Sequence, residues 1–99
     1  LEVLGTGATL VQFSTEFCGS CPGTRRLLQR IASDREDLAY LDVDLTADPD
    51  LASRLRILQT PTVFVLDRGG RLVSRIGGSP RLDVLERALV TATTHSPTP

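Results

Sequence analysis

The chain has 99 residues, a net charge of −1, 40% apolar residues and 23% charged residues. This length fits a single domain around one hydrophobic core, and the composition is too apolar for an intrinsically disordered protein. All 11 basic residues are arginine and 12 carboxylates balance them, which excludes the strongly basic surface of a general nucleic-acid binder.

The first half of the chain alternates strand patterns with a helix pattern. Residues 9–14 are nearly continuously apolar, which is typical of a strand buried on both faces. After residues 18–23, a helix is predicted to continue to about residue 33. Its inward face is expected to carry Leu27, Leu28 and Ile31. Residues 38–44 alternate apolar and acidic side chains at their end, which indicates an edge strand.

A second helix is predicted to begin at Asp48 and Pro49, because aspartate is a good N-cap residue and proline fits the first helical position. Its inward face is expected to carry Leu51, Leu55 and Leu58. Strands at 62–66 and 71–76 are expected to form a hairpin around the glycine turn at 67–70.

A last helix is predicted to open at Ser79 and Pro80. Its inward face is expected to carry Leu82, Leu85 and Leu89. The element order is therefore βαβαββα. We interpret it as an α/β fold in which two parallel crossovers and one hairpin build a mixed four-stranded sheet with helices on both sides.

The domain is expected to span residues 1–93, followed by a disordered tail over residues 94–99 that contains the only histidine, His95. No uninterrupted apolar run exceeds four residues, so no segment of the chain is predicted to span a membrane or to form a signal-peptide core.

The only two cysteines, Cys18 and Cys21, are three positions apart. A disulfide that closes such a short loop constrains little of the unfolded chain. A structural zinc site normally needs four ligands, and His95 raises the number of candidate cysteine and histidine ligands only to three. Redox chemistry is therefore the first interpretation of this pair.

The sequence Cys-Gly-Ser-Cys lies between a predicted strand and a predicted helix. The first turn of a helix presents unpaired N–H groups and a positive dipole end, which would stabilise a thiolate at Cys18. Cys21 lies one helical turn further on, close enough to displace whatever Cys18 captures, and Gly19 leaves Cys18 approachable. The alternatives are two buried thiols that lie close together by chance, or a metal site that bridges a dimer.

Four segments of the chain together resemble the thioredoxin family. Residues 10–21 are similar to the family's strand and active-site turn, and residues 43–44 fall where its next strand ends. Residues 60–62, Thr-Pro-Thr, resemble its cis-proline loop, and Gly77 resembles the glycine that closes its substrate groove. The match covers about residues 9–90 in the family's order and spacing. The resemblance implies a thioredoxin-like fold and a thiol–disulfide oxidoreductase that reduces protein disulfides.

The resemblance also implies roles for individual residues. Cys18 would be the nucleophile and Cys21 the resolving thiol. Pro61, in the cis form, would pack against the disulfide and keep metals away from the thiols, while the backbone of Thr60 pairs with an extended substrate segment. The walls of the groove would be formed by Phe17 and Gly77.

The resemblance further implies no cofactor and no metal beyond the redox-active disulfide. The expected partners are protein substrates that contain disulfides and a reductase or other thiol electron donor, with no nucleic acid. We expect a monomer in the cytoplasm.

The chain departs from the family's pattern at several positions. Gln12 stands where members commonly carry a buried carboxylate, and glutamine cannot act as a general base. Water, Glu16 or the second thiol's own titration would have to replace it, or the resolving step would be slower. Tyr40 stands where a lysine is often found.

The beginning of the chain also departs from the family. Residues 1–7 are too few for the strand and helix that usually precede the first strand here, so we expect this part of the full fold to be truncated. The first residue is leucine rather than methionine, which suggests an excised domain. The alternative localisation is therefore a soluble domain of a membrane-anchored or exported protein.

Two other functions are compatible with the sequence. A glutaredoxin-like enzyme that uses glutathione would suit the short N-terminus and the pair Gly77 and Gly78, although no lysine precedes Cys18. A non-catalytic thioredoxin-like binding module, or a metal chaperone with thiolate ligands, would suit the absence of a base at Gln12.

Overall fold

The computed structural model describes residues 4–94. The elements follow the predicted order βαβαββα. They are β1 (Ala8–Ser14), α1 (Cys21–Ser33), β2 (Leu38–Asp44), α2 (Pro49–Arg54), β3 (Thr62–Asp67), β4 (Leu72–Gly77) and α3 (Leu82–Thr94). The predicted disordered tail lies, apart from its first residue, outside the described residues, as does His95, so the domain boundary near residue 93 stays a prediction.

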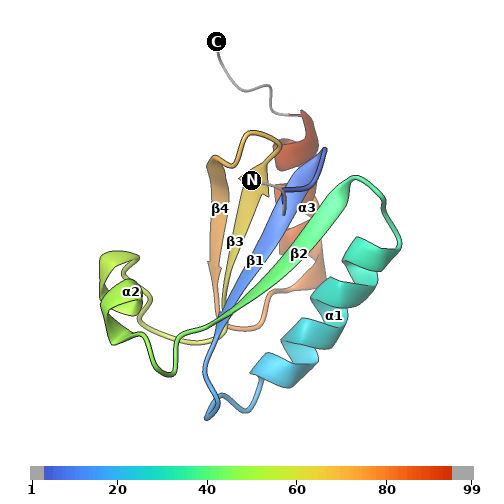
Figure 1. The fold of residues 1–99 in the computed structure, drawn as a ribbon. Helices are drawn as coiled ribbons and strands as arrows, with labels where there is room; N and C mark the ends of the chain where they lie inside the picture. The colour runs from blue at the N-terminus through green and yellow to red at the C-terminus, as the bar shows by residue number, and fades with distance from the viewer. Residues whose placement is uncertain (1–3, 95–99) are drawn as a thin grey trace.

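The four strands form one mixed sheet in the order β2-β1-β3-β4 (Figure 1). Strands β1 and β2 are parallel, while β3 runs antiparallel to β1 and to β4. The prediction of two parallel crossovers was therefore wrong, because only the connection through α1 is one. Thr62 at the start of β3 pairs with Phe13 near the end of β1, so the chain enters β3 at the edge where β1 and β2 end. The short helix α2 turns the chain around at that edge.

Helices cover both faces of the sheet, as predicted. Helices α1 and α3 pack on one face, where Leu28 of α1 and Leu85 of α3 share a buried cluster with Leu10 of β1. Helix α2 lies against the other face, where Leu51 and Leu55 pack on a smaller cluster built around Phe13 and Phe64 of the neighbouring strands β1 and β3. The rings of these two phenylalanines meet edge to face, with their centroids 4.7 Å apart.

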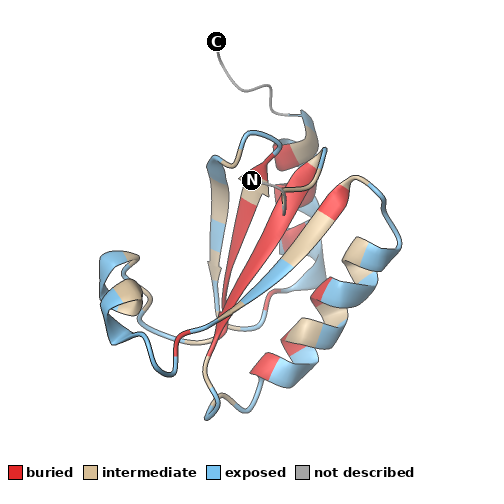
Figure 2. Cartoon of the chain, in the orientation of Figure 1, coloured by how far each residue is buried: buried red, intermediate tan, exposed pale blue. Residues whose placement is uncertain are grey.

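Strand β1 is the centre of the molecule and is buried at all seven positions (Figure 2). Alternate side chains of β1 pack into the two buried clusters on opposite faces of the sheet, which explains the nearly continuous apolar run in the sequence. Strand β2 is an edge strand with exposed positions, as its acidic side chains predicted. The end of β1 is thus held by strands on both sides, which fixes the start of the loop that follows it.

Two of the predicted inward leucines face solvent instead. Helix α2 ends at Arg54, so Leu58 lies beyond the helix and is 95% exposed. The spacing of the three leucines does not place Leu58 inward, because the helix is only six residues long. Leu82 is the first residue of α3 and is 53% exposed, whereas Leu85 and Leu89 are buried as predicted.

Two local predictions about chain turns are confirmed. Asp48 caps α2, because its Oδ1 accepts a hydrogen bond from the backbone N–H of Leu51 at 3.1 Å. The turn between β3 and β4 is held by Asp67, whose Oδ1 accepts from the backbone N–H groups of Gly69 and Arg71. Gly70 has φ +85° in this turn, a conformation that favours glycine. Within residues 4–94, no helix is long and apolar enough to cross a membrane.

Candidate active site

The loop between β1 and α1 carries a disulfide between Cys18 and Cys21, whose Cα atoms lie 5.4 Å apart. Cys21 is the first residue of α1 and Ser20 is its N-cap. The Cys21 backbone N–H donates to the Cys18 carbonyl at 3.3 Å, and Ser20 Oγ lies 3.9 Å from Cys18 Sγ. The disulfide therefore lies against the positive end of the helix dipole, where a thiolate is stabilised.

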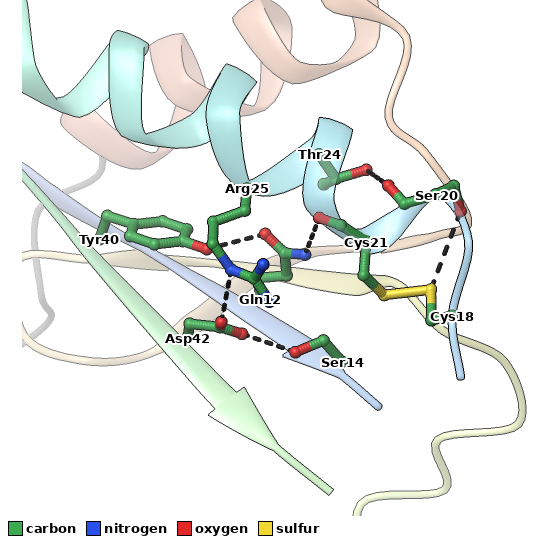
Figure 3. A network of polar contacts seen from close by, with 9 residues as sticks. All are labelled: Gln12, Ser14, Cys18, Ser20, Cys21, Thr24, Arg25, Tyr40 and Asp42. Carbon is green, nitrogen blue, oxygen red and sulfur yellow. Dashed lines mark hydrogen bonds and ion pairs between the residues drawn. A yellow bond between two sulfur atoms is a disulfide. The ribbon is translucent and has the colours of Figure 1, made fainter. Parts of the chain in front are cut away.

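The two cysteines differ in their access to solvent. Cys21 is only 1% exposed, whereas Cys18 is partly exposed. In Figure 3 the Cys21 side chain comes from the first turn of α1 and Cys18 from the loop before it. Of the two cysteines, Cys18 is therefore the one that is open to solvent.

The loop that carries Cys18 is supported by the segment that follows β2. The backbone N–H of Glu16 donates to Thr46 Oγ1 at 2.9 Å, and the backbone N–H of Thr46 donates to Asp44 Oδ1 at 2.8 Å. Hydrogen bonding from the side chain and the backbone of Thr46 holds the pKa of Asp44 below its usual value. The Glu16 residue is exposed. Its carboxylate therefore lies on the surface and not beneath the disulfide.

A buried amide lies directly behind Cys21 (Figure 3). Gln12 is 0% exposed. Its Nε2 donates to the Cys21 carbonyl at 3.0 Å, and its Oε1 accepts from the Tyr40 hydroxyl at 2.8 Å. Burial, assisted by the negative charge of Asp42, raises the pKa of Tyr40 to about 12 and outweighs the opposing effect of Arg25. Tyr40 is therefore neutral at physiological pH.

A charged pair lies beside this buried amide and joins α1 to the sheet. Arg25 Nε donates to Asp42 Oδ2 at 2.8 Å, and Ser14 Oγ donates to Asp42 Oδ1 at 2.7 Å. The hydrogen bond and the charge of Asp42 raise the pKa of Arg25. The pairing therefore ties the first turns of α1 to the edge strand β2.

The peptide bond between Thr60 and Pro61 is cis, as predicted from the sequence. The Pro61 side chain is fully buried, and its carbonyl accepts from the backbone N–H of Gly78 at 2.8 Å. Thr60 Oγ1 lies 3.5 Å from Thr15 Oγ1. This contact brings the cis-proline loop next to the loop that carries Cys18, although the two are far apart in the sequence.

Gly77 closes β4 opposite Thr62 of β3. A Cβ atom at Gly77 would lie 2.5 Å from Gln59 Nε2, so glycine allows the Gln59 side chain to lie across this position. A surface groove of about 300 Å³ includes Gln59, Thr62 and Gly77 in its lining. Phe17, the residue before Cys18 in the sequence, is 87% exposed.

Two contributors to the site were not predicted from the sequence. Ser20 approaches Cys18 Sγ, and Thr24 Oγ1 lies 3.4 Å from Ser79 Oγ, which links α1 to the segment before α3. Neither contact has a sequence signal, because hydroxyl residues are common near helix starts for capping alone. The bond between Gln12 and Tyr40 did have a signal. Both residues were singled out as departures, and alternation along neighbouring strands places them on the same face.

No group of three or more histidine, cysteine, aspartate or glutamate side chains that could hold a metal occurs within residues 4–94.

The comparisons with known proteins agree with this geometry. The family model described as Thioredoxin matches residues 2–91. Thioredoxin H2-1 of Oryza sativa subsp. japonica is 34% identical over 91 residues, which cover 92% of this chain and 64% of that protein. Thioredoxin of Mycolicibacterium smegmatis is 34% identical over 92 residues, covering 89% of this chain and 81% of that protein.

The chain also matches part of a longer protein and a solved structure. The bifunctional thioredoxin reductase/thioredoxin of Mycobacterium leprae is 33% identical over 81 residues, which cover 81% of this chain and 18% of that protein. The crystal structure of thioredoxin f from spinach chloroplast superposes with a TM-score of 0.75 at 25% identity, covering 89% of this chain and 72% of that one.

The family match spans nearly the whole chain and includes the Cys18–Cys21 disulfide. The chain therefore belongs to the thioredoxin family of thiol–disulfide oxidoreductases.

Proposed function

We propose that this protein reduces protein disulfides, with Cys18 as the nucleophile and Cys21 as the resolving thiol. The observation that carries the assignment is the difference in exposure, because Cys18 is accessible and Cys21 is 1% exposed. The position of Cys18 before the first turn of α1 supports a thiolate at neutral pH.

The reaction takes two steps. The Cys18 thiolate attacks one sulfur of the substrate disulfide, forms a mixed disulfide and releases the other substrate sulfur as a thiolate. The Cys21 sulfur then attacks Cys18 Sγ, restores the Cys18–Cys21 disulfide and releases the second substrate thiolate. Two electrons pass from the dithiol to the substrate, and each released thiolate takes up a proton from water.

The docking surface that we propose consists of Phe17, Thr60, Pro61 and Gly77. The exposed ring of Phe17 supplies apolar contact next to the disulfide. The cis-proline loop contacts the Cys18 loop through Thr15 and Thr60, so its backbone lies where an extended substrate segment could pair as an added strand.

Thioredoxins take electrons from a thioredoxin reductase, and in the Mycobacterium leprae relative the two activities are named in one protein. We propose a thioredoxin reductase as the electron donor here, and no cofactor beyond the disulfide. We also propose that the protein acts as a monomer in a reducing compartment, the cytoplasm, and binds no nucleic acid. The net charge of −1 supports the last point, and the reducing direction supports the compartment.

The test is capture of the mixed disulfide. In the Cys21→Ser variant the first step proceeds and the second cannot, so the reduced variant mixed with a disulfide-linked polypeptide such as insulin should accumulate a covalent adduct. In the Cys18→Ser variant no adduct should form, because Cys21 is buried. Mass spectrometry under non-reducing conditions identifies the bonded cysteine. An adduct at residue 21 in the Cys18→Ser variant, with none at residue 18 in the other, would reverse the assignment.

A further inference from the structure

The side chain of Gln12 bridges the resolving cysteine and a neighbouring strand (Figure 3). Its Nε2 donates to the Cys21 carbonyl at 3.0 Å and its Oε1 accepts from the Tyr40 hydroxyl at 2.8 Å. A carbonyl oxygen only accepts hydrogen bonds, so the group that faces Cys21 must be the amide NH2. The orientation of the amide is thus fixed by chemistry, and every polar atom of its side chain has a partner.

The titratable groups that face Gln12 are a neutral phenol and an ion pair. On β2 they are Tyr40, which is neutral, and Asp42, which is paired with Arg25 of α1. On β3 the residue opposite Gln12 is Val63, and Asp67 lies across from Ala8 at the other end of β1. The residues that α3 contributes to the buried cluster on this face are leucines and alanines.

We propose that Gln12 and Tyr40 form a neutral clamp that positions Cys21 for the resolving step and takes no part in moving its proton. This inference rests on the proposed function, in which Cys21 displaces the substrate from Cys18. Gln12 is a positioning residue, because it holds the carbonyl of Cys21 and not its sulfur. The clamp fixes the first turn of α1 while the disulfide opens and closes.

The proton balance of the resolving step follows from the clamp. The Cys21 thiol loses its proton to water, its sulfur electron pair forms the bond to Cys18 Sγ, and the substrate sulfur leaves as a thiolate. The amide of Gln12 cannot accept the proton, and the Tyr40 oxygen already donates its own proton to Gln12. The rate of this step should therefore follow one ionisation only, that of the Cys21 thiol.

A glutamate at position 12 would have the same shape and a different chemistry. A protonated carboxyl can donate to the Cys21 carbonyl and accept from Tyr40, as the amide does. An ionised carboxylate has only acceptors and would face the Cys21 carbonyl without a proton. Burial raises the pKa of such a carboxyl, so the clamp would hold at low pH and open as the pH rises.

The experiment measures the resolving step directly. Reduced protein is mixed in a stopped-flow instrument with dithiobis-nitrobenzoate, which releases one coloured thiolate when Cys18 is modified and a second when Cys21 displaces the label. The second release is first-order and independent of reagent concentration. It is followed from about pH 5 to about pH 9, across the range in which cysteine thiols titrate. The wild type should show a single ionisation.

At low pH, the rate of the second release in the Gln12→Glu variant should match that of the wild type. The pH profile of the variant should show a second inflection, and above that pH the two rates should differ. The Gln29→Glu variant is the matched control, because it makes the same substitution at an exposed position of α1 and should run parallel to the wild type throughout. A Gln12→Glu profile parallel to the wild type, or a second ionisation in the wild type itself, would overturn the proposal.

The Tyr40→Phe variant tests the clamp without adding a titrating group, and it serves if Gln12→Glu fails to fold. Loss of one partly buried hydrogen bond should slow the second release about two- to tenfold while the profile keeps one ionisation. An unchanged rate would contradict the clamp. The cysteine that carries the label after the first release is located by mass spectrometry in the Cys21→Ser variant. If the label is on Cys18 but the pH profile of the second release contradicts the clamp, the clamp proposal fails and the proposed function stands. A label on another residue would contradict the proposed function itself.

Discussion

Gln12 and Tyr40 show what individual residues reveal before a structure is known. The resemblance to thioredoxins identified both as departures from a carboxylate and a lysine, and the structure shows that they lie on one face of the sheet. The resemblance did not predict that the Tyr40 hydroxyl donates a hydrogen bond to the Gln12 side chain. That outcome depends on the register of β1 and β2, in which Gln12 lies opposite Asp42 and Tyr40 lies opposite Leu10.

Tyr40 is the only tyrosine and the chain has no tryptophan, so its ionisation can be read directly from the phenolate absorbance. Burial and Asp42 should place the midpoint for the folded protein at about 12, against 10.0 for an unperturbed tyrosine. The same titration in denaturant should give the unperturbed value. A midpoint near the unperturbed value in the folded protein would show that the phenol is open to solvent and does not donate to Gln12.

The same shift predicts a pH dependence of stability. The pKa of Tyr40 is higher in the folded state, so its contribution is fully present below pH 10.0 and is lost as the pH rises through about 12. The Tyr40→Phe variant lacks this loss. The difference in unfolding free energy between wild type and variant should therefore be constant below the lower value and shrink above it.

Among the secondary-structure elements, the types and order were predictable and the direction of β3 was not. Periodicity and capping residues located all seven elements, including the Asp48 cap of α2. The direction of β3 depends on how the chain crosses the edge of the sheet after a helix of only six residues. Local patterns carry no information about that path. The exposure of Leu58 has the same cause, because α2 stops before the leucine spacing can place it inward.

The packing of α1 on the sheet can be tested with two leucines. Leu28 is 0% exposed in the cluster between α1, α3 and the sheet, so Leu28→Ala should lower the unfolding free energy by about 2–5 kcal/mol. Leu58 is 95% exposed, so Leu58→Ala should change it by about 0.5 kcal/mol or less. Denaturant titration of both variants gives the comparison. Equal losses would mean that the two leucines are packed alike.

For the whole molecule, the fold gathers the site at one edge of the sheet. Strands β1 and β2 end there and β3 begins there, which brings the Cys18 loop, the Thr46 support and the cis-proline loop together (Figure 1). The cysteine pair and Thr60-Pro61 could be read from the sequence because their residue types are distinctive. The unequal exposure of the two sulfurs could not, because it depends on which elements cover them.

The most direct test of the account is the reactivity of each sulfur in the reduced, folded protein. Iodoacetamide labelling at a series of pH values, with the modified cysteine identified by mass spectrometry, reports access and ionisation together. The account predicts that Cys18 is labelled first, with a pKa below the free value of about 8.5, while Cys21 is protected until the protein is denatured. Labelling of Cys21 as fast as Cys18, or a Cys18 pKa at or above that of a free thiol, would contradict it.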